Sequence, residues 1–247
     1  MKRRELLRTS TALGATGAFT AAAAATGAPV GARERPEGAD KGRGGPLRVQ
    51  VVMFDGVEEL DFAAPYEVFS AAGFFTRRAV QVRYVSASRL SGVTGAFGTA
   101  VGGIHRWAPE EADILVVPGG GYARPDKPGV QAEIARGTLP RALAAAVRPG
   151  LTIAAVCTGV ILCSAAGLTR NRPCTTHKGA RAELERQGGV LKNARVVDDG
   201  DLVTAGGITS GLELALWLVR RELGPETALS LEGMMEYEAR GTVWARE

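Results

Sequence analysis

The fold of this chain is decided by the stretch Leu151–Leu168, LTIAAVCTGVILCSAAGL. Residues 151–156 form a short apolar run that leads directly into Cys157, and a run of small, helix-compatible residues comes next. Because a short apolar run that ends at a turn is typical of a buried strand, the pattern predicts a strand, a sharp turn and a helix. Cys157 would then lie at the end of a sheet and beside the N-terminus of a helix.

This placement makes Cys157 a candidate nucleophile. Unpaired backbone N–H groups and the positive end of the helix dipole favour the thiolate over the thiol, and the thiolate is the reactive form. The arrangement resembles the strand–nucleophile–helix elbow of α/β-hydrolases, with cysteine in place of serine. The alternative is a small buried core residue, because unpaired cysteines are common in protein interiors.

Apolar strand patterns and helical patterns alternate along the chain on both sides of this stretch. They predict an α/β fold, namely a doubly wound, mostly parallel sheet with helices on both faces. Pro65 is expected in the first turn of the first helix. Strands are expected at 48–54, 80–86, 112–117, 151–156, 190–197 and 202–205; helices at 60–72, 130–147, 158–168, 180–187, 210–223 and 225–237; and a short hairpin at 90–104.

The N-terminal segment 1–32 has the pattern of a twin-arginine export signal. Arg3 and Arg4 precede two leucines and Arg8, and the uncharged run from Thr9 to Ala32 is rich in alanine, glycine and threonine. Such a weakly apolar run suits the twin-arginine route, and it disfavours the alternative of a membrane-spanning anchor. We therefore expect export by the twin-arginine machinery to the extracellular space or the cell envelope.

The rest of the chain is constrained by its composition. Residues 33–46 are charged and glycine-rich, which predicts a disordered linker, and one domain is expected over 47–240. The net charge of +4 falls to about +1 without segment 1–32, which holds four basic residues and one acidic residue, so nucleic-acid binding is not expected. Three cysteines and two histidines without zinc spacing predict neither a disulfide scaffold nor a metal site, although a Cys163–Cys174 bond stays open.

In parallel α/β sheets, the functional site lies at the C-terminal ends of the strands. Three segments are predicted to meet there: Cys157, the turn 119–121 and the acidic loop 55–61. Backbone amides of the glycine turn and of Thr158 could stabilise a developing oxyanion, although tight-turn geometry alone also explains the glycines. Asp61 could be the proton partner of the thiol, or it could only cap the adjoining helix or interact with its dipole.

These segments together resemble one known superfamily. The motifs are FDGVEELDFAAPYEVF (54–69), VVPGG (116–120), AAVCTGVILCSAAGL (154–168), TTH (175–177) and VVDDGDLVTAGGITSGLELAL (196–216). In this order and spacing they resemble the ThiJ/PfpI superfamily, which is flavodoxin-like and similar in fold to the class I glutamine amidotransferases. The resemblance extends from about residue 47 to residue 237 and covers the whole predicted domain.

The resemblance implies roles for individual residues. Cys157 takes the position of the elbow nucleophile, Asp61 that of the acid that contacts the thiol, and Gly120 that of the oxyanion glycine, with Gly119 beside it. Thr158 comes directly after the nucleophile, where the isonitrile hydratase branch has threonine and the protease-like branch has histidine. Proteolysis is therefore not expected.

The histidine of the TTH motif, His177, matches a histidine found near the site in several branches. Its alternative role is a structural hydrogen bond to nearby backbone. The sequence does not decide between the two.

The function that the resemblance implies is that of a cysteine-dependent enzyme most similar to the isonitrile hydratase branch. It would act on a small molecule without a metal or organic cofactor, and it would form a homodimer, as is common in the superfamily. Alternatives on the same site are another thiol hydrolase, a glyoxalase-type lyase, or a non-catalytic domain that senses a ligand or the redox state through Cys157. No helix-turn-helix pattern comes after the domain, so a transcription factor is not expected.

Overall fold

The computed structural model describes residues 44–88, 91–124 and 126–246. The predicted export signal lies outside the described residues, as does the predicted linker up to residue 43. The helices within the described ranges are all too short or too polar to cross a membrane.

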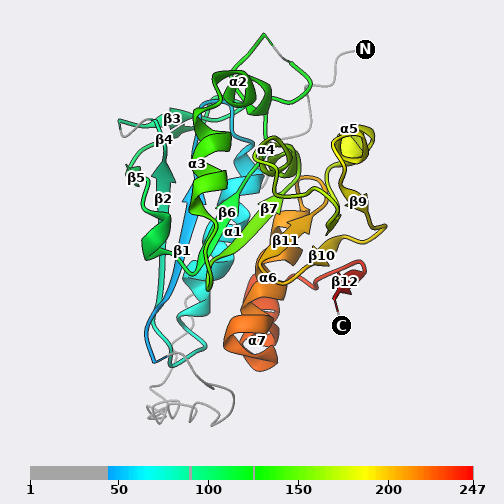
Figure 1. Ribbon diagram of the computed structural model, residues 1–247. Helices are drawn as coiled ribbons and strands as arrows, with labels where there is room; N and C mark the ends of the chain where they lie inside the picture. Colours follow the sequence, from blue (N-terminus) through cyan, green and yellow to red (C-terminus); the bar gives the residue numbers. More distant parts are fainter. Residues whose placement is uncertain (1–43, 89–90, 125, 247) are drawn as a thin grey trace, which may run out of the picture. The chain divides into compact units, whose positions relative to one another are not determined.

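A single eight-stranded sheet forms the centre of the fold, in the order β12-β10-β11-β7-β6-β1-β2-β5 (Figure 1). Every neighbouring pair is parallel except β10 and β11, which are antiparallel. The strands are β1 (Leu47–Val52), β2 (Val80–Ser86), β5 (His105–Arg106), β6 (Ile114–Val117), β7 (Thr152–Val156), β10 (Val196–Asp198), β11 (Leu202–Ala205) and β12 (Val243–Ala245).

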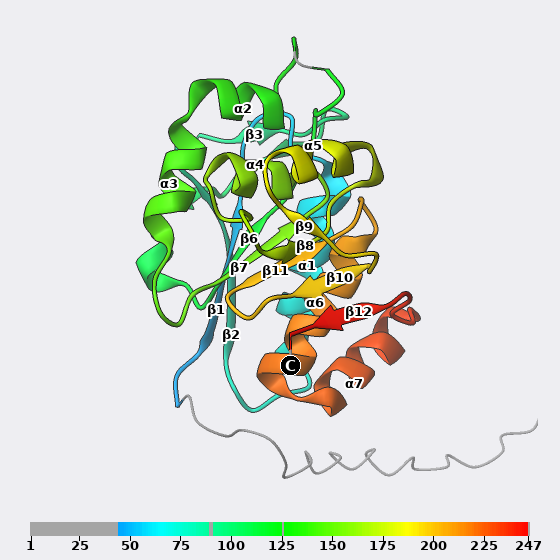
Figure 2. The ribbon, with the colours of Figure 1, turned by 45° about the vertical axis from the view of Figure 1, so that its right-hand side comes forward.

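Helices cover both faces of this sheet, which confirms the predicted doubly wound α/β fold (Figures 1 and 2). One face carries α1 (Glu59–Ala72), α6 (Ser210–Leu223) and α7 (Pro225–Met235), which pack against one another. The other carries α2 (Val130–Arg136), α3 (Thr138–Ala146), α4 (Gly159–Ala165) and α5 (Arg181–Arg186).

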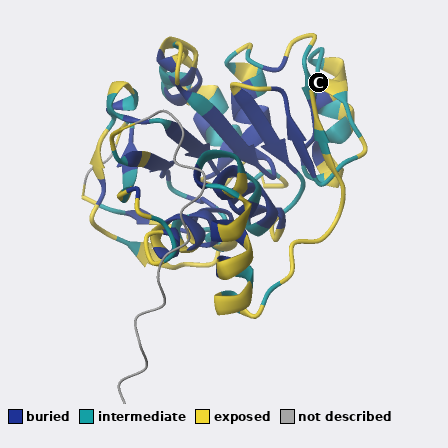
Figure 3. Ribbon diagram, turned by 90° about the horizontal axis from the view of Figure 1, so that it is seen from below, coloured by how far each residue is buried: buried dark blue, intermediate teal, exposed yellow. Residues whose placement is uncertain are grey.

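The central strands lie in the core, and Figure 3 shows them buried between the helices. The strands β6 and β11 are buried along their whole length. This explains the continuous apolar sequence of β6, since a parallel strand that is covered on both faces does not alternate with polar residues. The one polar residue of β11, Thr204, accepts a hydrogen bond from the Thr175 amide at 2.9 Å.

Smaller elements surround the sheet. The hairpin expected at 90–104 is present as the antiparallel pair β3 (Val93–Thr94) and β4 (Ala100–Val101). The strands β8 (Pro173–Cys174) and β9 (Val190–Leu191) form a separate parallel pair. Single 3₁₀ turns lie at Pro109–Glu111 and Lys178–Ala180.

Three local predictions were wrong. The helix expected at 130–147 is divided into α2 and α3 by Gly137, which has a left-handed φ of 72°. The strand expected at 190–197 is interrupted, and its ends pair in different sheets as β9 and β10. Pro65 lies in the second turn of α1, so the carbonyl of Asp61, four residues earlier, receives no helical hydrogen bond from it.

The sheet also extends beyond the expected domain end at residue 240. The strand β12 pairs with β10, and the Arg246 amide donates to the Asp198 carbonyl at 3.0 Å. The Arg246 side chain forms an ion pair with Asp199. The last strand therefore belongs to the same domain.

Candidate active site

The three segments predicted to form the site meet at the C-terminal ends of neighbouring parallel strands. Cys157 comes directly after β7, Gly119 and Gly120 come after β6, and Asp61 lies in the first turn of α1, the helix after β1. The parallel register of these strands brings residues together that lie almost one hundred positions apart in the sequence.

Cys157 forms a strained turn between β7 and α4. Its φ is 56°, a left-handed value that is uncommon for a residue with a side chain. The Cys157 amide donates to the Gly206 carbonyl at 2.8 Å, and the Thr176 hydroxyl donates to the Cys157 carbonyl at 2.7 Å. Backbone strain of this kind costs about 1–3 kcal/mol and is concentrated at functional sites. The predicted strand, turn and helix are thus confirmed.

Asp61 is completely buried, and its Oδ2 accepts a hydrogen bond from the Gly119 amide at 2.9 Å. The helix cap position belongs to Glu58, and no side chain caps α1. Of the alternative roles considered for Asp61, helix capping is wrong, while its place in the first turn of α1 agrees with a partner of the helix dipole. Its Oδ1 is buried without a hydrogen-bond partner among the described residues.

The Asp61 carboxyl group and the Cys157 thiol shift each other's pKa. Burial raises the pKa of Asp61 to about 7, against the opposing hydrogen bond from Gly119. Burial, and secondarily the charge of Asp61, raises the pKa of Cys157 to about 12, although the amides of Ile208 and Thr158 act in the opposite direction. The contact between the two side chains shifts both pKa values, but it does not have the geometry of a standard hydrogen bond to Oδ1.

The backbone amides at the turn favour the thiolate, as expected, because those of Thr158 and Ile208 lower the pKa of Cys157. In the resting protein, burial and the neighbouring carboxyl group have the larger effect. The thiol is protonated near neutral pH, and it needs a base to become a nucleophile. Asp61 is placed to be that base once it has ionised.

The glycine turn holds the site together through contacts that only glycine permits. Gly120 has a φ of 136°, and a Cβ there would lie 2.2 Å from the Gly56 carbonyl oxygen. Its amide already donates to Thr158 Oγ1 at 3.1 Å. In this arrangement, Gly120 orients Thr158 and presents no free amide to an oxyanion.

The amides that face the Cys157 sulfur are those of Thr158 and Ile208. Ile208 was not predicted. It has a φ of 42°, which is unusual for a β-branched residue and which aims its N–H at the thiol. The sequence does not predict this conformation, because isoleucine normally adopts an extended or a helical backbone conformation.

His177 makes the structural hydrogen bond that was one of its two predicted roles. Its Nδ1 accepts from the Gly179 amide at 3.1 Å and caps the turn Lys178–Ala180. Burial lowers its pKa, with further lowering by Lys178 and Arg181. No described interaction joins its ring to the Cys157 thiol.

The remaining cysteines lie away from the site. Cys163 and Cys174 are fully buried, and both are free thiols, so the Cys163–Cys174 bond that the sequence left open does not form. Within residues 44–88, 91–124 and 126–246, no group of three or more His, Cys, Asp or Glu side chains could hold a metal ion.

Comparison with known proteins identifies the family. The sequence profile of the DJ-1/PfpI family matches residues 47–221. The chain belongs to this family. Isonitrile hydratase from Pseudomonas putida is 32% identical over 194 residues, which cover 77% of this chain and 78% of that protein. The Parkinson disease protein 7 homolog from Danio rerio is 27% identical over 190 residues, which cover 75% of this chain and 94% of that protein.

Solved structures agree with this DJ-1/PfpI assignment. A ThiJ/PfpI family protein from Pseudomonas syringae superposes with a TM-score of 0.69 at 25% sequence identity, covering 79% of this chain and 77% of that chain. The superfamily recognised from the sequence motifs is thus confirmed.

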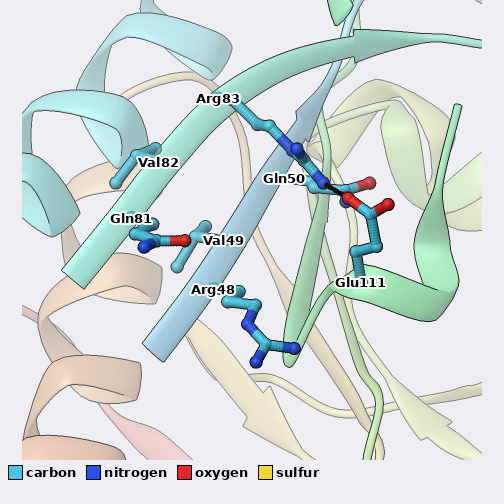
Figure 4. A pocket seen from close by; sticks show the side chains of 7 residues that line it. All are labelled: Arg48, Val49, Gln50, Gln81, Val82, Arg83 and Glu111. Atoms are coloured by element: carbon cyan, nitrogen blue, oxygen red, sulfur yellow. Dashed lines mark hydrogen bonds and ion pairs between the residues drawn. The ribbon is translucent and has the colours of Figure 1, made fainter. Parts of the chain in front are cut away.

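Of two cavities in this DJ-1/PfpI domain, one lies next to the candidate active site and the other lies far from it. A cavity of about 750 Å³ is lined by Thr176, Gly206 and Ile208, the same residues that contact Cys157. A smaller pocket of about 220 Å³ lies on the first halves of β1 and β2, at the opposite end of the strands (Figure 4). Its Arg83 is paired with Glu111, as the dashed line in Figure 4 marks.

Proposed function

We propose that this DJ-1/PfpI protein is a cysteine-dependent enzyme that hydrates an isonitrile to an N-substituted formamide. The observation that carries the proposal is the buried Asp61 carboxyl group beside the Cys157 thiol, in a strained turn at the end of β7. Similarity to isonitrile hydratase over more than three quarters of both chains supports the choice of substrate.

In the proposed first step, ionised Asp61 accepts the thiol proton while the Cys157 sulfur attacks the isonitrile carbon and forms an S–C bond. Asp61 then delivers this proton to the same carbon. The product is a thioimidate, in which that carbon carries one hydrogen, the sulfur and a C=N double bond.

In the second step, water adds to the thioimidate carbon, with Asp61 again moving the proton. The C–S bond breaks, its electron pair returns to sulfur, and the amides of Thr158 and Ile208 stabilise the charge that develops there. One isonitrile and one water give one formamide, the thiol is regenerated, and the reaction needs no external oxidant or reductant.

The test is formamide formation from an aryl isonitrile by the purified protein, measured by chromatography. We expect turnover by the wild type and none by Cys157→Ala, and we expect mass spectrometry of quenched reactions to show the thioimidate on Cys157. A Cys163→Ala variant is the matched control, because that thiol is fully buried within α4. No turnover by the wild type would contradict the proposal.

A second candidate function is a ligand-sensing or redox-sensing domain that uses the same thiol. The raised pKa of Cys157 and its 5% exposure lower the reactivity of the thiol, which favours non-catalytic ligand sensing, whereas a redox sensor needs a more reactive thiol. Timed alkylation separates the two. Labelling of Cys157 well ahead of Cys163 and Cys174, without turnover of an isonitrile, a thioester or an α-oxoaldehyde, would support the sensor. Turnover of a thioester would instead indicate a thiol hydrolase, and turnover of an α-oxoaldehyde would indicate a glyoxalase-type lyase.

We also propose that the protein is exported by the twin-arginine route, on the pattern of segment 1–32. Replacement of Arg3 and Arg4 by lysine should leave the protein in the cytoplasm. Unchanged export of this variant would point to another route.

A homodimer is the proposed assembly, by analogy with the superfamily. Light scattering on the exported protein tests it. A mass of one chain at high protein concentration would overturn it.

A further inference from the structure

The cavity beside Cys157 carries positive charge that its own walls do not neutralise. Fourteen residues line it, and none of them is an aspartate or a glutamate. Three of them are basic: Lys178, Arg181 and Arg195. Cys157 is not one of the lining residues, but it contacts one of them: the Thr176 hydroxyl donates to the cysteine carbonyl at 2.7 Å.

Arg195 is held by neighbouring side chains. Its Nε lies 2.8 Å from Glu213 Oε1, and its Nη2 donates to Thr209 Oγ1 at 2.6 Å. Because the Glu213 side chain is only 4% exposed, this carboxylate compensates the charge of Arg195 effectively. Arg195 therefore belongs to the structural wall of the cavity.

Lys178 and Arg181 have no such compensation. In the part of the chain that the structure describes, neither side chain forms an ion pair or a hydrogen bond. The Nε of Arg181 is shielded from solvent and lacks an acceptor. The Nε of Arg148 and Arg195 share this property, so what distinguishes Lys178 and Arg181 is that two unpaired cations line one cavity, an arrangement that calls for an explanation.

The position of the two cations relative to the thiol suggests that explanation. His177, the last residue of the TTH motif, lies against Gly207, where an added Cβ would approach the imidazole Cδ2 to 2.3 Å. The next residue, Ile208, aims its amide at the Cys157 sulfur. Lys178 and Arg181 therefore line the same cavity as Ile208, whose amide contacts the thiol.

We propose that this cavity binds an anionic substituent of the substrate, a carboxylate or a phosphate, through Lys178 and Arg181. Guanidinium and ammonium groups form strong charge-assisted hydrogen bonds to both kinds of anion. Only the identity of the reaction rests on the proposed function; the anion site rests on the cavity and its uncompensated cations.

The first experiment compares kcat/KM for 4-isocyanobenzoate with kcat/KM for 4-isocyanobenzamide, its neutral counterpart. The wild type should prefer the carboxylate by about tenfold or more, because a charge-assisted hydrogen bond contributes about that factor. Arg181→Gln and Lys178→Gln should each lower the preference by about tenfold, chiefly through KM. Arg181→Lys should retain most of it, because the charge remains.

The second experiment does not depend on isonitrile turnover. Benzoate, phenyl phosphate and neutral benzamide are tested for protection of Cys157 against iodoacetamide in the full-length protein. The two anions should slow alkylation of the wild type and the benzamide should not, and the protection should be lost in Arg181→Gln. The anion that protects at the lower concentration shows whether the cavity prefers a carboxylate or a phosphate.

Arg186→Gln is the matched control, because Arg186 lies on α5 with Arg181 but is exposed and outside the cavity. Melting curves of every variant verify that it is folded. If the wild type hydrates neither isonitrile, the proposed function fails, and the protection assay alone decides the anion site. Equal protection by benzoate in the wild type and in Arg181→Gln, or no protection by either anion, would overturn it.

Discussion

Near neutral pH, Cys157 and Asp61 together hold at most one negative charge. With a pKa of about 7 for Asp61 and about 12 for Cys157, the carboxyl group loses its proton first. Asp61 is therefore the group that changes charge in the physiological range. The protonation state of Asp61 decides whether this carboxyl group can accept the proton of the Cys157 thiol.

Asp61→Asn keeps the shape of the side chain and removes the base. We expect turnover of an isonitrile to fall by about 10²–10⁴-fold, which is the usual contribution of general acid–base catalysis. In the wild type, kcat/KM should rise as the pH passes through about 7, because the ionised form of Asp61 is required. A rate profile with the same rise in the variant would contradict this role. Glu67→Gln, an exposed substitution on α1, is the control.

The same substitution should change how stability depends on pH. The pKa of Asp61 in the folded protein lies above its ordinary value of 3.8, so between about pH 4 and pH 7 the folded state keeps a proton that the unfolded chain has lost. Stability therefore falls as the pH rises through this window and is level above it. Urea unfolding should show a loss of roughly 2–4 kcal/mol from this group in the wild type and no such loss in Asp61→Asn.

The left-handed φ of 56° at Cys157 predicts a difference between two inactive variants. Glycine adopts this conformation freely, whereas a Cβ makes it unfavourable. Cys157→Gly should therefore be more stable than Cys157→Ala by about 1 kcal/mol, or about 2–4 °C in melting temperature. Calorimetry of both variants measures this, and an alanine variant as stable as the glycine variant would show that the turn is not strained.

At this scale, residue type and spacing predicted where Cys157, Asp61 and Thr158 lie, because strand ends can be located from apolar runs. The sequence could not predict the pKa of the thiol, which depends on burial by segments distant in the chain. It also missed Ile208, whose amide faces the sulfur only because of an unusual backbone conformation.

Elements were predicted best where the apolar pattern is long and uninterrupted. The strand β2 and the helix α6 have the bounds that were expected from sequence. The division between α2 and α3 was missed because both helices are compatible with one continuous pattern. The break is marked by Gly137, which ends α2 in a left-handed conformation, and by Pro140 in the first turn of α3.

Backbone hydrogen bonds of Gly56 to Thr94 and of Ala96 to Val57 join the hairpin of β3 and β4 to the loop before α1, and Glu59 adds a side-chain attachment. Its Oε1 accepts hydrogen bonds from the Phe97 amide at 2.9 Å and the Thr99 amide at 3.4 Å. Burial alone would raise the pKa of Glu59, but these amides lower it. At a pH above the usual glutamate pKa, the ionised Glu59 therefore holds the hairpin in full. This contact is lost as the pH falls below the lowered pKa of Glu59 in the folded protein.

Glu59→Ala should loosen this hairpin without unfolding the domain. We expect amide exchange at Phe97 and Thr99 to become faster by about tenfold, since hydrogen bonds to a charged acceptor are removed. Glu59→Gln should have a smaller effect because an acceptor remains. Exchange measured by mass spectrometry at matched pH tests this, and unchanged rates in Glu59→Ala would show that other contacts hold the hairpin.

At the scale of the whole molecule, alternation of strand and helix patterns was enough to predict the sheet and its covering layers. The position of the last strand could not be predicted. Only three residues pair in β12, and their partner β10 lies more than forty positions earlier in the chain. Such pairing depends on the tertiary path of the chain and leaves no periodic signal.

The strand β12 closes one edge of the sheet, and its removal should destabilise the domain. Deletion of residues 242–247 would leave the amides of Arg195 and Val196 without the Thr242 carbonyl to which they donate, and the outer edge of β10 would become exposed. It would also remove Arg246, whose guanidinium pairs with the buried Asp199.

We expect this deletion to cost about 2 kcal/mol, because a few backbone hydrogen bonds at about 1 kcal/mol each are partly offset by the freedom that the segment regains. The melting temperature should fall by about 4–8 °C. Arg246→Gln alone should cost less, because Asp199 keeps its contact with Arg172 at 2.6 Å. Calorimetry of the two variants separates the strand from the ion pair. A deletion variant with the same melting temperature as the wild type would show that β12 pairs with the sheet without stabilising it.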